Sequence, residues 1–273
     1  MMERMTVLRG PNPLRLGIFA ANCSSGLAIT QVPERWQASW KSNERVAQLA
    51  DDAGIEFMLP IARWRGYGGP TDFQKNTFET IAWASGLLAR TRRLNVLGTI
   101  HVPLVHPIIA AKQTVTVDHM SEGRFGLNIV CGWNEDEFSM FGMRQRDHDV
   151  RYQYGQEWLE IVDRIWTSDV PFEYSGQFFQ LNDVVGFPKP WAGTRPVIMN
   201  AGASRAGREF GIQNCDILFT IIADLDNARS DVEALQHQAA SRGRSGLEVF
   251  TSCYVVCRPT REEAIDYHHY YAQ

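Results

Sequence analysis

The chain has 273 residues, an apolar fraction of 44% and eight tryptophans, which is ample material for a hydrophobic core. Its formal net charge of −4 and the lack of a basic stripe argue against nucleic acid as the main partner. No apolar run approaches the roughly 18 residues that span a membrane, and the start has no signal-type apolar core. Five scattered cysteines without a CxxC pair indicate reduced thiols and no metal site, so we expect a cytoplasmic protein.

The first half of the chain alternates short apolar runs with helical patterns. The runs predict strands at 14–21, 56–60 and 94–100, and a fourth in the stretch 124–133, which opens into a turn. The intervening segments predict helices at 40–53, 76–90 and 107–120. Two long loops, at 22–39 and 61–75, interrupt the pattern, and loops of this length are uncommon unless they are functional.

The second half contains two predicted insertions and three more strands. The first insertion covers 131–150 and precedes an amphipathic helix at 151–167; the second, at 169–190, resembles a hairpin. Strands are predicted at 197–200, 216–222 and 248–256. Helices are predicted after Ser204, at 224–242 and after Thr260.

Strand followed by helix, repeated along a chain, predicts an α/β fold with a parallel sheet. No GxGxxG follows the first strand, so a Rossmann nucleotide site has no support. The seven βα units are one fewer than a closed (β/α) barrel needs. Either one strand is missed, or the barrel lacks its eighth unit and the first and last strands are not hydrogen-bonded to each other. We predict one domain over 1–273.

Polar residues at the carboxyl ends of the predicted strands are candidates for chemistry, because ligands sit at that end of a barrel. Asn128 is the polar residue on an otherwise apolar strand, and Thr99 ends the strand before it. The alternatives are an asparagine bound into the following turn and a threonine that is merely a satisfied β-branched strand residue.

Two predicted helix starts are suited to phosphate, because free backbone N–H groups and the helix dipole favour an anion there. One carries Arg151 and Tyr152, and the other carries Ser204 after Ala201-Gly202. A solvated Arg151 and an ordinary N-cap at Ser204 remain alternatives.

The remaining polar clusters are interpreted as structural. His101 and His106 flank the end of the third strand; a position facing a pocket stays open for both, but we interpret them as structural residues. The acidic run 135–137 is expected to form a solvated turn. No Ser-His-Asp or Cys-His arrangement has a supporting motif such as a GxSxG elbow.

Several motifs together resemble the bacterial luciferase-like flavin monooxygenases. They are Asp118-His-Met-Ser-Glu-Gly-Arg-Phe-Gly-Leu-Asn-Ile-Val-Cys-Gly-Trp133, Glu137-Phe138, Asp149-Val-Arg-Tyr152 and Arg65-Gly-Tyr-Gly-Gly69, with Phe178-Phe179 and Ser204 at matching spacing. Within that superfamily the chain is most similar to the branch of pyrimidine oxygenase, dimethylsulfone monooxygenase and enzymes that oxidise aryl halides. The resemblance covers the chain from about Leu14 to the end.

The resemblance implies a TIM-type barrel that binds reduced FMN and uses dioxygen. It also implies a separate NAD(P)H-dependent flavin reductase, a homo-oligomer and a small organic substrate such as a heterocycle, a sulfone or a halogenated aromatic. It places flavin contacts at Ala62, Arg63, Asn128, Glu137, Arg151, Tyr152 and Ser204. Thr99 and Asn128 match the pair that flanks the oxygen-reacting face of the flavin.

Two alternatives remain open at the level of sequence. One is an oxidoreductase of the same superfamily that uses a deazaflavin, and the other is a flavin-binding subunit without activity. The histidine that luciferases carry after the second strand is replaced here by the segment Pro60-Ile-Ala-Arg63, which argues against an aldehyde substrate.

Overall fold

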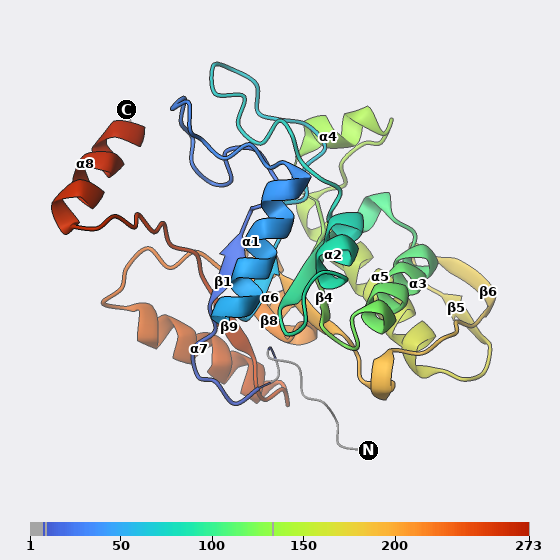
Figure 1. The fold of residues 1–273 in the computed structure, drawn as a ribbon. Coiled ribbons are helices and arrows are strands. Elements are labelled where there is room, and N and C mark those ends of the chain that lie inside the picture. The colour runs from blue at the N-terminus through green and yellow to red at the C-terminus, as the bar shows by residue number, and fades with distance from the viewer. Residues whose placement is uncertain (1–7, 9, 133, 273) are drawn as a thin grey trace.

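A seven-stranded parallel sheet, curled into an open barrel, forms the centre of the computed structural model (Figure 1). The structure describes residues 8, 10–132 and 134–272, so the end of the predicted 124–133 motif, Trp133, lies outside the described residues. The strand order is β1-β2-β3-β4-β7-β8-β9. The strands are β1 (Gly17–Phe19), β2 (Phe57–Leu59), β3 (Asn95–His101), β4 (Phe125–Val130), β7 (Val197–Asn200), β8 (Ile217–Phe219) and β9 (Glu248–Phe250).

Helices flank the outside of this sheet and connect its strands, and one further helix, the last in the chain, stands apart. They are α1 (Trp40–Ala53), α2 (Thr80–Leu88), α3 (Pro107–Met120), α4 (Glu135–Met140), α5 (His148–Thr167), α6 (Arg205–Asn214), α7 (Ala228–Ser241) and α8 (Arg261–Tyr271), with short 3₁₀ turns at Val102–Leu104 and Trp191–Gly193. A separate antiparallel hairpin, β5 (Phe172–Ser175) and β6 (Gln180–Val184), lies between α5 and β7. The predicted insertion at 169–190 therefore contains the expected hairpin.

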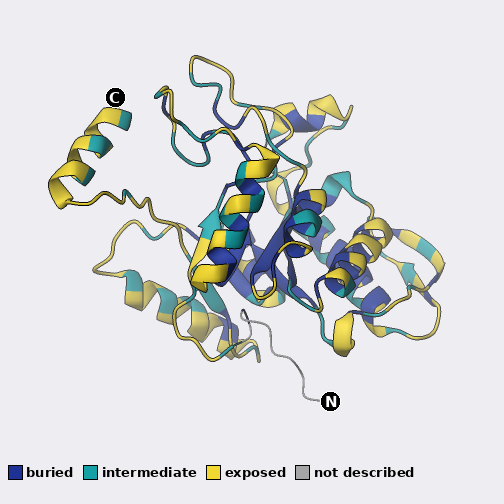
Figure 2. Ribbon diagram, viewed as in Figure 1, coloured by how far each residue is buried: buried dark blue, intermediate teal, exposed yellow. Residues whose placement is uncertain are grey.

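The central strands are buried on both faces, which explains their nearly continuous apolar sequence (Figure 2). One face, inside the barrel, packs Phe57, Leu59, Leu97, Met199 and Ile217 together. The other face packs against the helices, where Trp83 and Trp158 are the largest fully buried side chains. Because side chains alternate along β3 and β4, Thr99 and Asn128 share the inner parity with Leu97 and Gly126.

The first and last strands form the two edges of the sheet, as the count of seven βα units predicted. No hydrogen bond joins β1 to β9 within the described residues. Side chains nevertheless meet across the barrel. Phe57 and Phe250 lie 5.0 Å apart between ring centroids, and Arg15 pairs with Glu248 at 2.7 Å. Gly17 is needed for this packing, since a Cβ there would lie 2.2 Å from the Phe57 ring.

Several observed elements differ from the predicted ones. The last strand ends at Phe250 and not at 256, because only three residues of β8 are available to pair with it. Helix α5 begins at His148, so its first turn falls within the predicted insertion at 131–150. The acidic run expected to form a solvated turn is the first turn of α4, where the Asn134 side chain accepts a hydrogen bond from the N–H of Asp136.

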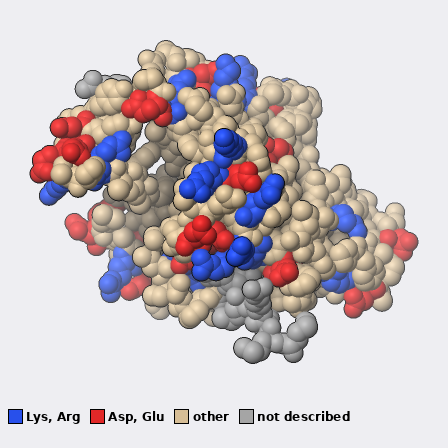
Figure 3. Space-filling model, viewed as in Figure 1, with Lys and Arg blue, Asp and Glu red and all other residues tan. Residues whose placement is uncertain are grey.

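The C-terminal helix α8 stands away from the barrel (Figure 1) and buries none of its residues. It contacts the loop at 22–39, where the hydroxyl of Tyr267 donates to Glu34 at 3.2 Å. Side chains of both charges are interspersed over the face shown in Figure 3. Among the described helices, none is long and apolar enough to cross a membrane.

Candidate active site

A cavity of about 450 Å³ lies at the carboxyl ends of the strands. Seven of the eight residues predicted for the site line it: Ala62, Arg63, Thr99, Asn128, Arg151, Tyr152 and Ser204. Glu137 does not line it. The structure therefore brings together residues that are separated by up to 142 positions in the chain, from Ala62 to Ser204. This volume is within the range of roughly 300–1,000 Å³ that is typical of small-molecule sites.

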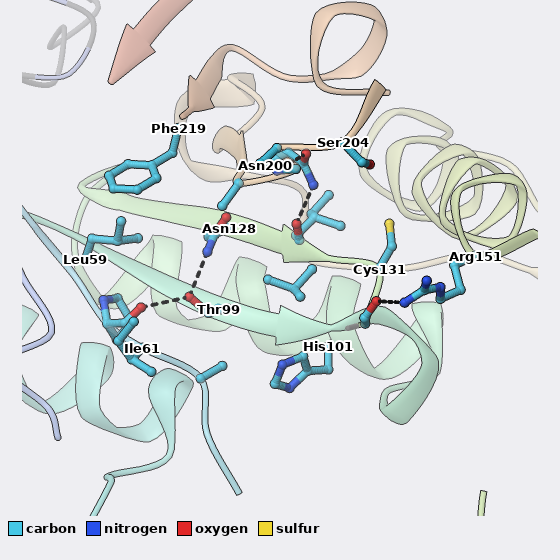
Figure 4. A pocket seen from close by; sticks show the side chains of 18 of the residues that line it. Leu59, Ile61, Thr99, His101, Asn128, Cys131, Arg151, Asn200, Ser204 and Phe219 are labelled. Atoms are coloured by element: carbon cyan, nitrogen blue, oxygen red, sulfur yellow. Dashed lines mark hydrogen bonds between the residues drawn. The ribbon is translucent and has the colours of Figure 1, made fainter. Parts of the chain in front are cut away.

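Thr99 and Asn128 form a hydrogen-bonded pair in this cavity (Figure 4). They are opposite each other in the β3–β4 register, and the Asn128 amide nitrogen donates to Thr99 Oγ1 at 3.1 Å. The Thr99 hydroxyl donates in turn to the carbonyl of Pro60 at 3.3 Å. Asn128 Oδ1 is buried and has no partner among the described residues. The alternative of an Asn128 bound into the following turn is wrong, because its amide nitrogen binds the neighbouring strand.

The opposite end of the cavity is polar, as Figure 4 shows for Arg151 and Ser204. The Ser204 hydroxyl accepts from the N–H of Gly207 at 3.1 Å and so caps α6, which confirms the N-cap interpretation. It also lies 3.0 Å from His148 Nε2. Arg151 donates to the carbonyl of Gly132, while its buried Nε has no partner among the described residues. An N-cap and a cavity-facing hydroxyl are compatible roles for Ser204.

Two titratable side chains at this end stay protonated at neutral pH. Burial raises the pKa of Cys131 to about 12, against the opposing effect of Arg151. Burial also raises the pKa of Tyr152 above its ordinary value, and the Ser204 hydroxyl opposes that shift. Cys131 consequently acts as a small apolar side chain in the cavity lining and not as a nucleophile. Tyr152 offers a phenolic O–H donor.

Glu137, on α4, binds the loop at 61–75 that borders the cavity. One of its oxygens, Oε1, lies 3.3 Å from the guanidinium of Arg63 and accepts the backbone N–H of Trp64 at 2.9 Å. Both side chains of the ion pair are at least 95% buried. Arg63 also donates to Gln74 at 3.3 Å and to the hydroxyl of Tyr67. Glu137 thus holds the loop at 61–75 against α4, although the two segments are far apart in sequence.

Sequence reasoning missed Asn200 and did not select His101 as a site residue. Asn200 ends β7 and therefore gave the same signal as Thr99 and Asn128, a polar residue at the carboxyl end of a strand. Its amide nitrogen donates to the carbonyl of Ile129 at 2.8 Å, and its oxygen accepts the N–H of Gly202 at 2.9 Å. It fixes the turn that leads into α6. His101 lines the cavity, but no feature of the sequence distinguishes it from a structural histidine.

His101 is held in its neutral form. Burial lowers its pKa from 6.5 to about 4; the carboxylate of Glu137 opposes this shift and Arg63 adds to it. Since the unfolded chain binds a proton near pH 6.5 and the folded chain only near pH 4, the unfolded state carries more protons between these values. The contribution of His101 to stability is therefore complete above pH 6.5 and is lost as the pH falls.

We expect this effect to appear when wild-type protein is compared with a His101→Phe variant in urea unfolding between pH 7 and 5. As the pH is lowered through 5.5, the free energy of unfolding of the wild type should decrease by about 1 kcal/mol per pH unit more than that of the variant. Parallel pH dependences for the two proteins would contradict a depressed pKa.

Comparisons with known proteins show what the chain is similar to. The family model described as luciferase-like monooxygenase matches residues 14–273. The FMNH₂-dependent dimethylsulfone monooxygenase of Pseudomonas putida is 31% identical over 253 residues, which are 92% of this chain and 68% of that protein. The pyrimidine monooxygenase RutA of Acinetobacter baylyi is 29% identical over 257 residues, 92% of this chain and 69% of that protein.

Solved structures share the fold. The riboflavin lyase RcaE, crystallised with modified FMN and riboflavin, matches with a TM-score of 0.84 at 24% identity, over 94% of this chain and 66% of that one. DmoA from Hyphomicrobium sulfonivorans matches with a TM-score of 0.82 at 19% identity, over 95% of this chain and 64% of that one. The chain thus spans about two thirds of the length of these relatives.

Proposed function

Because this chain belongs to the luciferase-like monooxygenase family, we propose that it is an FMN-dependent monooxygenase that uses reduced FMN and dioxygen to oxidise a small organic substrate. The observation that carries the proposal is the Thr99–Asn128 pair in a cavity whose other end is lined by Arg151 and Ser204. Small hydrogen-bonding groups suit the oxygen-reacting side of a flavin, and cationic and helix-terminal donors suit its phosphate.

The residues present fit FMN. Asn128 Oδ1 and Arg151 Nε are buried polar atoms without a partner among the described residues, and a bound flavin offers groups that would satisfy both. The phosphate would lie between the helix starts near Arg151 and Ser204. The ring would lie toward Thr99 and Asn128, with Ala62 and Arg63 beside it. When bound, reduced FMN supplies the electrons that activate dioxygen.

The protein's own contribution is position and exclusion of water. Thr99 is 6% exposed and Asn128 is 5% exposed, so their hydrogen bonds act in a largely dry pocket, where such bonds are stronger than in water. Glu137, predicted as a flavin contact, acts in this proposal by holding Arg63 at the cavity wall. Tyr152 and Ser204 would donate to the phosphate.

The wider setting is also part of the proposal. We propose that this protein is a cytoplasmic homo-oligomer. A separate NAD(P)H-dependent flavin reductase would supply its reduced FMN. The names of the relatives place a sulfone and pyrimidines among the substrates of this branch, so a sulfone, a heterocycle or a halogenated aromatic is the substrate class that we propose.

The test is oxygen uptake after mixing the protein with reduced FMN and a panel of sulfones, heterocycles and halogenated phenols. Product formation that incorporates one oxygen atom from labelled O₂ supports the monooxygenase. Oxygen uptake no faster than that of reduced FMN alone, without product from any panel compound, would favour the non-catalytic subunit. Turnover under strict anaerobic conditions with a deazaflavin would favour the hydride-transfer alternative.

The phosphate site makes a separate prediction. Arg151→Ala should weaken FMN binding by about 1.5–3 kcal/mol, or roughly 10- to 150-fold, because it removes a charge-assisted hydrogen bond. Titration of FMN fluorescence measures the change. Arg146→Ala is the matched control: Arg146 lies in the same segment but packs 4.2 Å from the Tyr154 ring and does not line the cavity. Equal FMN affinity for wild type and Arg151→Ala would exclude this phosphate site.

A further inference from the structure

A second cavity, of about 440 Å³, adjoins the first at the end of β3. Four residues line both cavities: Ala62, Arg63, Thr99 and His101. The remaining walls come from the N-terminal ends of α2 and α3 and the segment between β3 and α3. They include Trp64, Phe78, Leu104, Val105 and Ile109. A molecule in this largely apolar space would therefore touch the same residues that border the proposed flavin site.

His101, on the boundary between the two cavities, has a defined tautomer. Its Nδ1 lies 3.2 Å from the indole Nε1 of Trp64. An indole nitrogen only donates, so Nδ1 must be the unprotonated, accepting nitrogen of the ring. Because the depressed pKa keeps the imidazole neutral, the single proton sits on Nε2. His101 is thus a neutral hydrogen-bond donor.

The donor at Nε2 has no protein acceptor among the residues that the structure describes. The residue is only 6% exposed and lines both cavities, so a ligand in either cavity lies beside the His101 ring. A ligand that supplies an acceptor gains a hydrogen bond from this donor in a pocket with little access to bulk water. The same donor disfavours a ligand of equal shape that has no acceptor, which is a source of specificity.

We propose that His101 is a further substrate-binding residue, which donates from Nε2–H to an acceptor oxygen, carbonyl or sulfonyl, of a small and largely apolar substrate in the second cavity. This inference deepens the proposed function and rests on it, since the substrate must lie beside Thr99 for oxygen to be transferred to it. The donated hydrogen bond would also draw electron density from the atom that carries the oxygen. A neutral donor does this without transferring a proton.

The test uses two probes of nearly equal shape. Cyclohexanone carries a carbonyl oxygen at the position where methylenecyclohexane carries a CH₂ group. Their affinities are measured by calorimetry on the flavin-free protein and again with oxidised FMN present, so the result does not depend on turnover. The wild type should bind the ketone about tenfold more tightly than the hydrocarbon, the effect expected of one net hydrogen bond. His101→Phe should lose this preference and keep its affinity for the hydrocarbon.

Two further variants isolate the donor. His101→Gln retains an N–H donor and should retain part of the preference for the ketone. His237→Gln is the control: His237 is an exposed residue of α7 and is not among the lining residues of either cavity. It should bind both probes as the wild type does.

Equal wild-type affinity for the two probes, or no binding of either, would overturn the proposal. The proposal would also be overturned if His101→Phe lost affinity for both probes equally, because His101 would then contribute only to the shape of the cavity. The monooxygenase proposal can fail separately. If the protein preferred the ketone through His101 but neither bound FMN nor took up oxygen, the binding site would be supported and the monooxygenase function would not.

Discussion

Replacing Thr99 by valine is expected to lower the rate of substrate oxidation by about 10²- to 10³-fold, with little change in the affinity for FMN. Valine keeps the branched shape but removes the hydroxyl that accepts from Asn128 and donates to the carbonyl of Pro60. The hydroxyl is positioned before any reaction occurs, so its effect should appear in the rate. Interactions that strengthen only in the transition state change kcat more than binding.

The measurement is stopped-flow mixing of the complex of protein and reduced FMN with oxygenated buffer and a substrate identified by oxygen uptake. Thr99→Ser is the control, because it restores a hydroxyl at the same position and should recover most of the rate. FMN affinity is measured on the same proteins by fluorescence titration. Product yield and rate equal to wild type in Thr99→Val would remove Thr99 from the reaction.

Local signals predicted some helix ends well, although the helices predicted at 76–90 and 224–242 are shorter in the structure, at Thr80–Leu88 and Ala228–Ser241. The helix at 40–53 was predicted to the residue, because Gly54 follows it at φ = 80°, a conformation that glycine adopts without strain. The helix at 107–120 was also predicted exactly, since Pro107 is suited to its first turn. Each of these boundaries depends on residues within one turn of the helix end.

Strand ends were predicted less well because they depend on a neighbouring strand. The apolar run that begins at Leu14 predicted a strand from there, but Leu14 is 71% exposed and pairing starts only at Gly17. Val255 belongs to the run that predicted the last strand, yet it is 80% exposed. Apolar composition marks a possible strand, whereas its length is set by where the partner strand is available.

Part of the site was visible in the sequence because parallel strands bring their carboxyl ends together. That rule was sufficient to select Thr99 and Asn128, and the structure shows them in contact. The environment of His101 could not be predicted, since its neutral state depends on burial and on charges at Glu137 and Arg63, which are distant in sequence. The burial of Glu137 itself depends on a partner 74 positions earlier.

Glu137→Ala should be the most destabilising change in this part of the molecule, lowering the free energy of unfolding by about 3–5 kcal/mol. The substitution removes the carboxylate while the guanidinium of Arg63 remains buried, and it removes the acceptor for the backbone N–H groups of Trp64 and Arg65. A buried charge that loses its counter-charge costs more than the pair contributes when intact. Urea unfolding measures the loss.

Two further variants test whether the loss of stability comes from the buried charge of Arg63. Glu135→Ala removes an exposed carboxylate from the same helical turn of α4 and should change stability by less than about 1 kcal/mol. The double replacement Arg63→Met with Glu137→Leu removes both charges together and should be clearly more stable than Glu137→Ala alone, because no buried charge of this pair remains. If Glu137→Ala were no less stable than Glu135→Ala, the ion pair would not hold the loop at 61–75 in place, and another contact would have to position Arg63 at the cavity.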